Sequence, residues 1–179
     1  MSDALALPLQ GWQDFYILAG TAAATLVGLM FVAISLGSRL ITQQSMAALR
    51  VFLTPTIIHF IYVLVLATVM LIPAVRRMPL GILLVIAGLL SFGRSVSTVP
   101  YMLRQHRQQI IDAHDWTWYL IVPSLIYLMF VGTGIGLLLG ANQALNGLAF
   151  VSILLLVNGV RNAWDMVVWF AVKTDPPAH

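Results

Sequence analysis

Apolar residues fall into five long runs along the chain, separated by short polar segments. Each run holds roughly 20 residues or more, the length that an α-helix needs to cross the hydrocarbon core of a membrane. The predicted spans are residues 13–38, 54–75, 79–99, 117–140 and 147–172. The pattern therefore predicts an all-α integral membrane bundle of five transmembrane helices, forming one domain over residues 1–179.

Residues with known helix-end preferences mark the limits of these spans. Thr54-Pro55 has the form of an N-cap followed by a first helical residue, and Pro79 is placed to begin the third span. Asp115 is placed to cap the fourth span, and residues 140–143 read as a turn before the fifth. Residues 101–115 are predicted to be an amphipathic segment on the inner side that continues the third helix.

The distribution of Lys and Arg predicts the orientation. Short loops on the cytoplasmic side of membrane proteins carry an excess of these residues. One side of the predicted bundle holds Arg39, Arg50, Arg104, Arg107 and Lys173, and the other holds only Arg76 and Arg77. We therefore expect an outside N-terminus and a cytoplasmic C-terminus. The first apolar run is too long for a signal peptide and lacks a basic segment before it, so we interpret it as a retained helix.

The amino-acid composition indicates that lipid, rather than water, surrounds most of the chain. Hydrophobic residues make up 60% of the chain and charged residues 8%, against about 25% in soluble domains. The chain has no cysteine, which excludes disulfides, thiolate metal sites and a cysteine nucleophile. The net charge of +3 comes from scattered basic residues that form no face for phosphates, so we expect no nucleic-acid partner.

Small residues at four-residue spacing form ridges on two of the predicted helices. They are Gly20, Ala24 and Gly28 in the first span, and Gly132, Gly136 and Gly140 in the fourth. Such ridges allow helix backbones to approach closely in lipid. They fit packing within one bundle or an interface between copies of the chain.

The fifth span carries polar residues on one stripe of its inner half. Asn158, Arg161, Asn162 and Asp165 fall within about 100° of the helix circumference. Arg161 and Asp165 are four residues apart, so they can form an ion pair on one face. A single Arg or Asp in mid-membrane costs about 2.5–3.5 kcal/mol, and such residues usually face a bundle interior or a cavity.

Polar residues of two other helices are predicted at a similar depth. Thr56 and His59 stand about one turn inside the inner end of the second span, and Arg94 lies about 22 Å along the third. This convergence predicts a polar cluster. Simpler readings are also open: Arg94 can extend to the headgroups, His59 can be a neutral histidine bonded to Thr56 or Tyr62, and the Arg161–Asp165 pair can fix helix register.

The sequence offers little evidence for catalysis or for a bound cofactor. His106, His114 and Asp115 lie in the inner segment, but the two histidines are about 80° apart on a continuous helix, and Asp115 has a capping role. Haem ligation by two histidines would need a second histidine within the predicted spans, and His59 is the only one there. Nucleotide, zinc-protease and serine-hydrolase motifs are absent from the sequence. We therefore expect no metal, no cofactor and no catalytic residue, and an enzyme would have to rest on His59 and aspartates.

Three segments together resemble a group of small bacterial inner-membrane proteins. They are Ala24–Phe31 in the first span, Thr54-Pro-Thr-Ile-Ile-His-Phe60 in the second, and Asn162-Ala-Trp-Asp165 in the fifth. The resemblance covers nearly the whole chain and implies a five-helix protein of the bacterial inner membrane with no known activity. In that group histidine often stands where this chain has Arg161, which implies a polar position rather than a required permanent cation.

Two functions fit these patterns. The first is a small homo-oligomeric channel or transporter-like protein, with a polar cavity open to the cytoplasm and lined by the predicted cluster. The leucine-rich outer half of the fifth helix would then form a hydrophobic constriction. The second is an accessory or scaffold subunit of a membrane complex, in which the polar cluster is structural.

Overall fold

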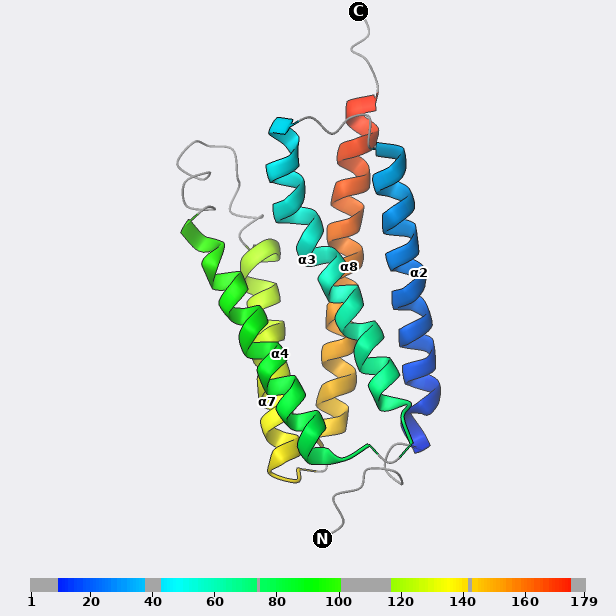
Figure 1. The fold of residues 1–179 in the computed structure, drawn as a ribbon, viewed down its shortest axis with the longest axis vertical. Helices are drawn as coiled ribbons and strands as arrows, with labels where there is room; N and C mark the ends of the chain where they lie inside the picture. Colours follow the sequence, from blue (N-terminus) through cyan, green and yellow to red (C-terminus); the bar gives the residue numbers. More distant parts are fainter. Residues whose placement is uncertain (1–9, 38–42, 74, 101–116, 142, 175–179) are drawn as a thin grey trace, which may run out of the picture. The chain divides into compact units, whose positions relative to one another are not determined.

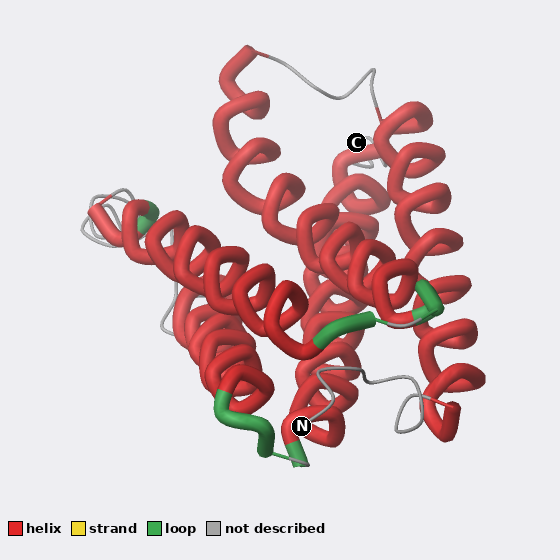
Figure 2. The backbone as a smooth tube through the Cα atoms, turned by 60° about the horizontal axis from the view of Figure 1, so that its bottom comes forward, coloured by secondary structure: helices red, strands yellow, loops and turns green. Residues whose placement is uncertain are grey.

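The computed structural model describes residues 10–37, 43–73, 75–100, 117–141 and 143–174, and its regular elements are helices (Figures 1 and 2). In chain order they are η1 (Gln10–Trp12), α2 (Gln13–Gly37), α3 (Gln43–Met70), α4 (Arg77–Ser97), η3 (Thr117–Ile121), α7 (Val122–Leu138) and α8 (Ala144–Thr174). The all-α prediction is thus confirmed for this part of the chain. The predicted inner segment 101–115 lies outside the described residues.

Within the described ranges, four helical stretches have the length and composition to cross a membrane. They are Gln13–Leu36, Arg77–Ser97, Thr117–Leu138 and Ala144–Val168, and α3 adds the shorter apolar stretch Thr54–Met70. Large apolar side chains are exposed along these helices, among them Leu18, Leu90, Leu125 and Val157. Such a surface is compatible with a multi-pass membrane bundle, because lipid covers apolar side chains that water would not.

The start of α3 differs from the prediction. The helix begins at Gln43, and Pro55 lies inside it rather than at its first position. Proline lacks an N–H and leaves the carbonyl four residues earlier without its helical partner, yet membrane helices tolerate it where neighbouring groups compensate. Figure 1 shows that α3 changes direction along its length. A TP pair alone therefore could not tell a helix start from a proline within a longer helix.

Proline also shapes the fourth predicted span. Thr117–Ile121 forms a π-helical turn, and α7 follows with Pro123 in its first turn. Because Pro123 donates no hydrogen bond to the carbonyl of Tyr119, the turn before it can widen. The end of α3, at Met70, comes five residues before the predicted limit of the second span. The starts of α4 and α8 lie two and three residues before their predicted positions.

The described helices belong to two compact units. One comprises residues 1–13 and 72–154, and the other comprises residues 14–71 and 155–179. The first unit therefore contains α4, η3, α7 and the beginning of α8. The second contains α2, α3 and the rest of α8, from Leu155 onward.

In the first unit, α4 and α7 lie side by side in opposite directions (Figure 1). Glycines make this approach close. A Cβ added at Gly134 would come within 2.8 Å of the Gly81 carbonyl oxygen, and one at Gly88 would come within 2.7 Å of Val131. The two backbones thus pack without intervening side chains, as small residues allow in membrane helices.

The end of α7 is closed by its own backbone and by α4. Gly140 has φ 76, a left-handed conformation that glycine adopts without strain. Its N–H donates to the Leu137 carbonyl and that of Ala141 to the Gly136 carbonyl, the Schellman arrangement. The Arg77 guanidinium donates to the Gly140 carbonyl at 3.1 Å, which ties the beginning of α4 to this turn.

In the second unit, α2, α3 and α8 share an apolar core. Met30, Phe60 and Met166 come from the three helices in turn and are buried against each other. The Phe60 ring lies over Gly159, where an added Cβ would be 2.5 Å from the ring. At Gly20, an added Cβ would be 2.9 Å from the Ala67 side chain, so α2 also approaches α3 closely.

The predicted small-residue ridges only partly coincide with these contacts. Gly20 packs on α3, whereas Ala24 and Gly28 are exposed and Gly28 has open space where a Cβ would stand. In α7, Gly132 is exposed with open space, Gly136 lies near Ala144, and Gly140 is the turn residue beyond the helix. The α4–α7 contact therefore uses Gly134, which the four-residue spacing had missed.

Candidate functional site

The buried face of α3 places the candidate histidine. Thr56, His59, Phe60 and Val63 recur at helical spacing, and all are at most 1% exposed. Phe60 anchors this face to α8 through Gly159. His59 is therefore held inside the second unit by the same packing that positions its apolar neighbours.

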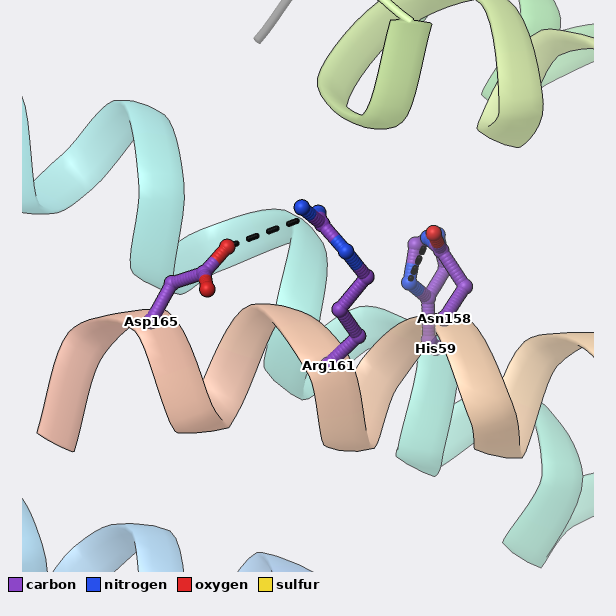
Figure 3. A network of polar contacts seen from close by, with 4 residues as sticks. All are labelled: His59, Asn158, Arg161 and Asp165. Atoms are coloured by element: carbon purple, nitrogen blue, oxygen red, sulfur yellow. Dashed lines mark hydrogen bonds and ion pairs between the residues drawn. The ribbon is translucent and has the colours of Figure 1, made fainter. Parts of the chain in front are cut away.

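His59 bonds to the fifth predicted span. Its Nδ1 lies 3.4 Å from Nδ2 of Asn158, and both side chains are buried (Figure 3). Because an amide nitrogen can only donate, neutral His59 accepts through Nδ1 and carries its proton on Nε2. This bond joins residues 99 positions apart and connects α3 to α8.

Arg161 and Asp165 form the predicted ion pair on α8. Nη1 of Arg161 is 3.4 Å from Oδ2 of Asp165, and the side chains are 25% and 39% exposed. Figure 3 shows that Arg161 and Asp165 project from the same side of α8 as Asn158. At this exposure an i,i+4 pair contributes only about 0.3–0.5 kcal/mol to stability.

Asn162 is the most unusual polar residue of the site. It is 3% exposed, and neither its Oδ1 nor its Nδ2 has a hydrogen-bond partner in the described part of the chain. Oδ1 of Asn158, one turn earlier, is buried and unpartnered as well. Each such atom costs about 1–3 kcal/mol. Two neighbouring buried amides thus present three polar atoms that no group in the described residues satisfies.

Within this cluster, the charged side chains are more exposed than the uncharged ones. The Arg161–Asp165 pair is partly exposed, whereas Asn162, Asn158 and their neighbour His59 are buried. The cluster therefore combines partly exposed charges with uncharged hydrogen-bonding groups that are buried in the second unit.

Other predicted polar residues belong to α4 and α2. Arg94 lies in the last turn of α4, in the first unit, and is exposed. On α2, the hydroxyls of Thr25 and Ser35 donate to the carbonyls of Thr21 and Phe31, four residues before each. Such back-bonding satisfies them without a partner helix. His106, His114 and Asp115 lie outside the described residues.

Two polar features were not found from the sequence. Tyr16 is 1% exposed, and its hydroxyl has no partner among the described residues. Its spacing from Ala19, Gly20 and Ala23, which are also buried, would have revealed that it faces inward. In the first unit, the Ser95 and Ser124 hydroxyls bond at 2.9 Å across α4 and α7, a pairing that no spacing within one helix reveals.

Comparison with known proteins assigns no family to the chain. No protein-family model, no curated protein and no solved structure matches it.

Proposed function

We propose that this chain is a small membrane transport protein, a channel or transporter-like protein that acts as a homo-oligomer. The buried amides of Asn158 and Asn162 carry the proposal. A polar cluster that only fixes helix register is expected to satisfy its own hydrogen bonds, since a partly satisfied network destabilises a core. Three unpartnered atoms in one turn of α8 fit a site whose partner arrives from outside the protein.

The neighbouring ion pair fits an entrance to that site. Arg161 and Asp165 are partly exposed and lie next to the buried amides on α8. Ionisable residues within membrane spans are rare and commonly mark solute pathways. In the proposed orientation, with a cytoplasmic C-terminus in a bacterial inner membrane, this entrance faces the cytoplasm. The leucine-rich segment of α8 before Asn158 forms the outer constriction.

Flux measurements on purified protein in liposomes test the proposal. We expect permeability to ions or small polar solutes above that of protein-free liposomes, between about pH 5 and about pH 8, the range in which histidine changes charge. Asp165→Asn should change the flux while leaving the melting temperature nearly unchanged, because the pair is partly exposed. No permeability to any solute across this range would contradict a transport function.

The alternative is an accessory or scaffold subunit of a membrane complex. The fully buried His59–Asn158 bond favours it, because such a bond between two helices fixes their register. This function predicts that the protein copurifies with a membrane partner in mild detergent. It also predicts that Arg161→Gln and Asp165→Asn lower detergent stability. Recovery of stable homo-oligomers without a partner would count against it.

A further inference from the structure

The three unpartnered atoms of Asn158 and Asn162 define the chemistry of their ligand. They comprise two carbonyl oxygens, which accept, and one NH₂ group, which donates. Four residues of helix separate the two side chains, about 6 Å along the axis. Two hydrogen bonds to one small molecule can join protein atoms that are up to about 5.5 Å apart. The spacing therefore suits a single small molecule that bridges both amides.

The same atoms disfavour an ion. Hard cations are held by six or more oxygens, often carboxylates, whereas this pair offers two neutral oxygens beside the Arg161 guanidinium. An anion would meet two carbonyl oxygens, which repel it, and a single NH₂ group, while Asp165 already compensates the charge of the nearby guanidinium. A buried water, by contrast, makes about three hydrogen bonds and both donates and accepts.

We propose that Asn158 and Asn162 form a binding site for a small uncharged molecule that both donates and accepts hydrogen bonds, with water as the smallest member of this class. This inference rests on the proposed function in one respect: it names the class of solute that the protein would pass. The binding site itself stands on the burial and the unpartnered atoms of the two amides.

Nuclear magnetic resonance tests the binding site without any transport. The chain has four asparagines, Asn142, Asn146, Asn158 and Asn162, so selective ¹⁵N-asparagine labelling yields four side-chain NH₂ groups, each with a pair of proton signals. Asn158→Leu and Asn162→Leu assign the two buried groups, because each substitution removes one pair. Asn146, exposed near the start of α8, is the positive control for magnetisation transfer from water.

We expect transfer from water to the Asn162 side-chain amide of protein in lipid nanodiscs. Transfer at Asn146 with none at Asn162 would overturn the inference, because a dry amide cannot be part of a hydrated site. This readout is independent of flux. Water contact at Asn162 in a protein that passes no solute leaves the site in place and removes the transport function.

Flux assays then identify the solute. Stopped-flow light scattering of proteoliposomes compares an impermeant osmolyte, which reports water, with urea and glycerol, which report larger neutral solutes. A potassium flux assay tests whether the protein passes ions instead. We expect neutral permeability that Asn162→Leu lowers about tenfold, the factor for losing about one hydrogen bond to the solute. Asn146→Leu, at an exposed position of α8, is the matched control and should leave the permeability unchanged.

Flux of potassium but of no neutral solute would overturn the assignment of solute class while supporting transport. Neutral flux that Asn162→Leu leaves unchanged would also overturn the assignment, provided that the variant elutes and melts like the wild type. If Asn162→Leu does not fold, Asn158→Leu takes its place in the same comparison.

Discussion

At the residue scale, the polar residues of α8 differ by their surroundings more than by their type. Asn158 and Asn162 are both buried amides, yet Asn158 has His59 as a partner through one atom and Asn162 has none among the described residues. Arg161, between them in the sequence, reaches the partly exposed Asp165. About two helical turns thus combine a bond between helices, an ion pair and an unsatisfied amide, and these call for different tests.

The His59–Asn158 bond is expected to contribute to stability as a coupled pair. A double-mutant cycle with His59→Leu and Asn158→Leu should give a coupling free energy of about 0.5–1.5 kcal/mol, since each substitution removes the same hydrogen bond. Unfolding in mixed detergent micelles measures it. As a control, the cycle of His59→Leu with Asn146→Leu should give no coupling free energy, because Asn146 is exposed, although it lies on α8 like Asn158. Additive effects within about 0.3 kcal/mol would show that the bond adds nothing.

At the scale of elements, glycine position decides how closely helices pack. In α7, Gly132 and Gly134 are two residues apart, but only Gly134 faces the backbone of α4. In the second unit, Gly159 makes room for the Phe60 ring, which in turn holds the α3 face that carries His59. The contact between Gly159 and Phe60 thus supports the site by positioning the helix face that carries His59.

Alanine at the two glycines of α7 should have opposite effects. Gly134→Ala is expected to destabilise the protein by about 1–3 kcal/mol, because its Cβ would overlap the Gly81 carbonyl oxygen and Val85. Gly132→Ala meets open space and should be neutral or stabilising by up to about 1 kcal/mol through helix propensity. Thermal unfolding in detergent compares them. Equal destabilisation by both would place Gly132 in an interface, such as one between copies of the chain.

At the scale of the whole molecule, the described helices indicate a multi-pass membrane protein. Its orientation is predicted from the distribution of Lys and Arg along the sequence. In the predicted topology, Lys and Arg are concentrated on the side that holds the C-terminus. If this side is cytoplasmic, the partly exposed Arg161–Asp165 pair lies toward the cytoplasm, because α8 runs from Ala144 to Thr174 with the pair in its second half. The direction of the proposed pathway therefore depends on the orientation.

Cysteine labelling checks the orientation directly, because the natural chain contains no cysteine. Single substitutions Ser2→Cys and Ala178→Cys place a thiol near either end. With intact bacterial spheroplasts and a membrane-impermeant maleimide, we expect labelling at position 2 and protection at position 178 until the membrane is permeabilised. The reverse pattern would invert the orientation and place the proposed entrance outside.

Local patterns carried much of the prediction. The apolar runs gave the helices of the described residues to within a few positions at most ends, because lipid requires long uninterrupted apolar helices. The Arg161–Asp165 pair followed from spacing within one helix, since residues four apart are neighbours wherever the helix packs. Pro55 was misplaced because its local signal is the same at a helix start and inside a membrane helix.

The sequence by itself determined the helical class, the apolar surroundings and the polar stripe of α8, because each depends on neighbours along the chain. Only the tertiary structure decided that His59 bonds to Asn158, that Gly134 rather than Gly132 packs on α4, and that Asn162 is buried without a partner. Helical periodicity shows which residues share a face. Which atoms of another helix meet that face depends on how side chains of distant segments pack.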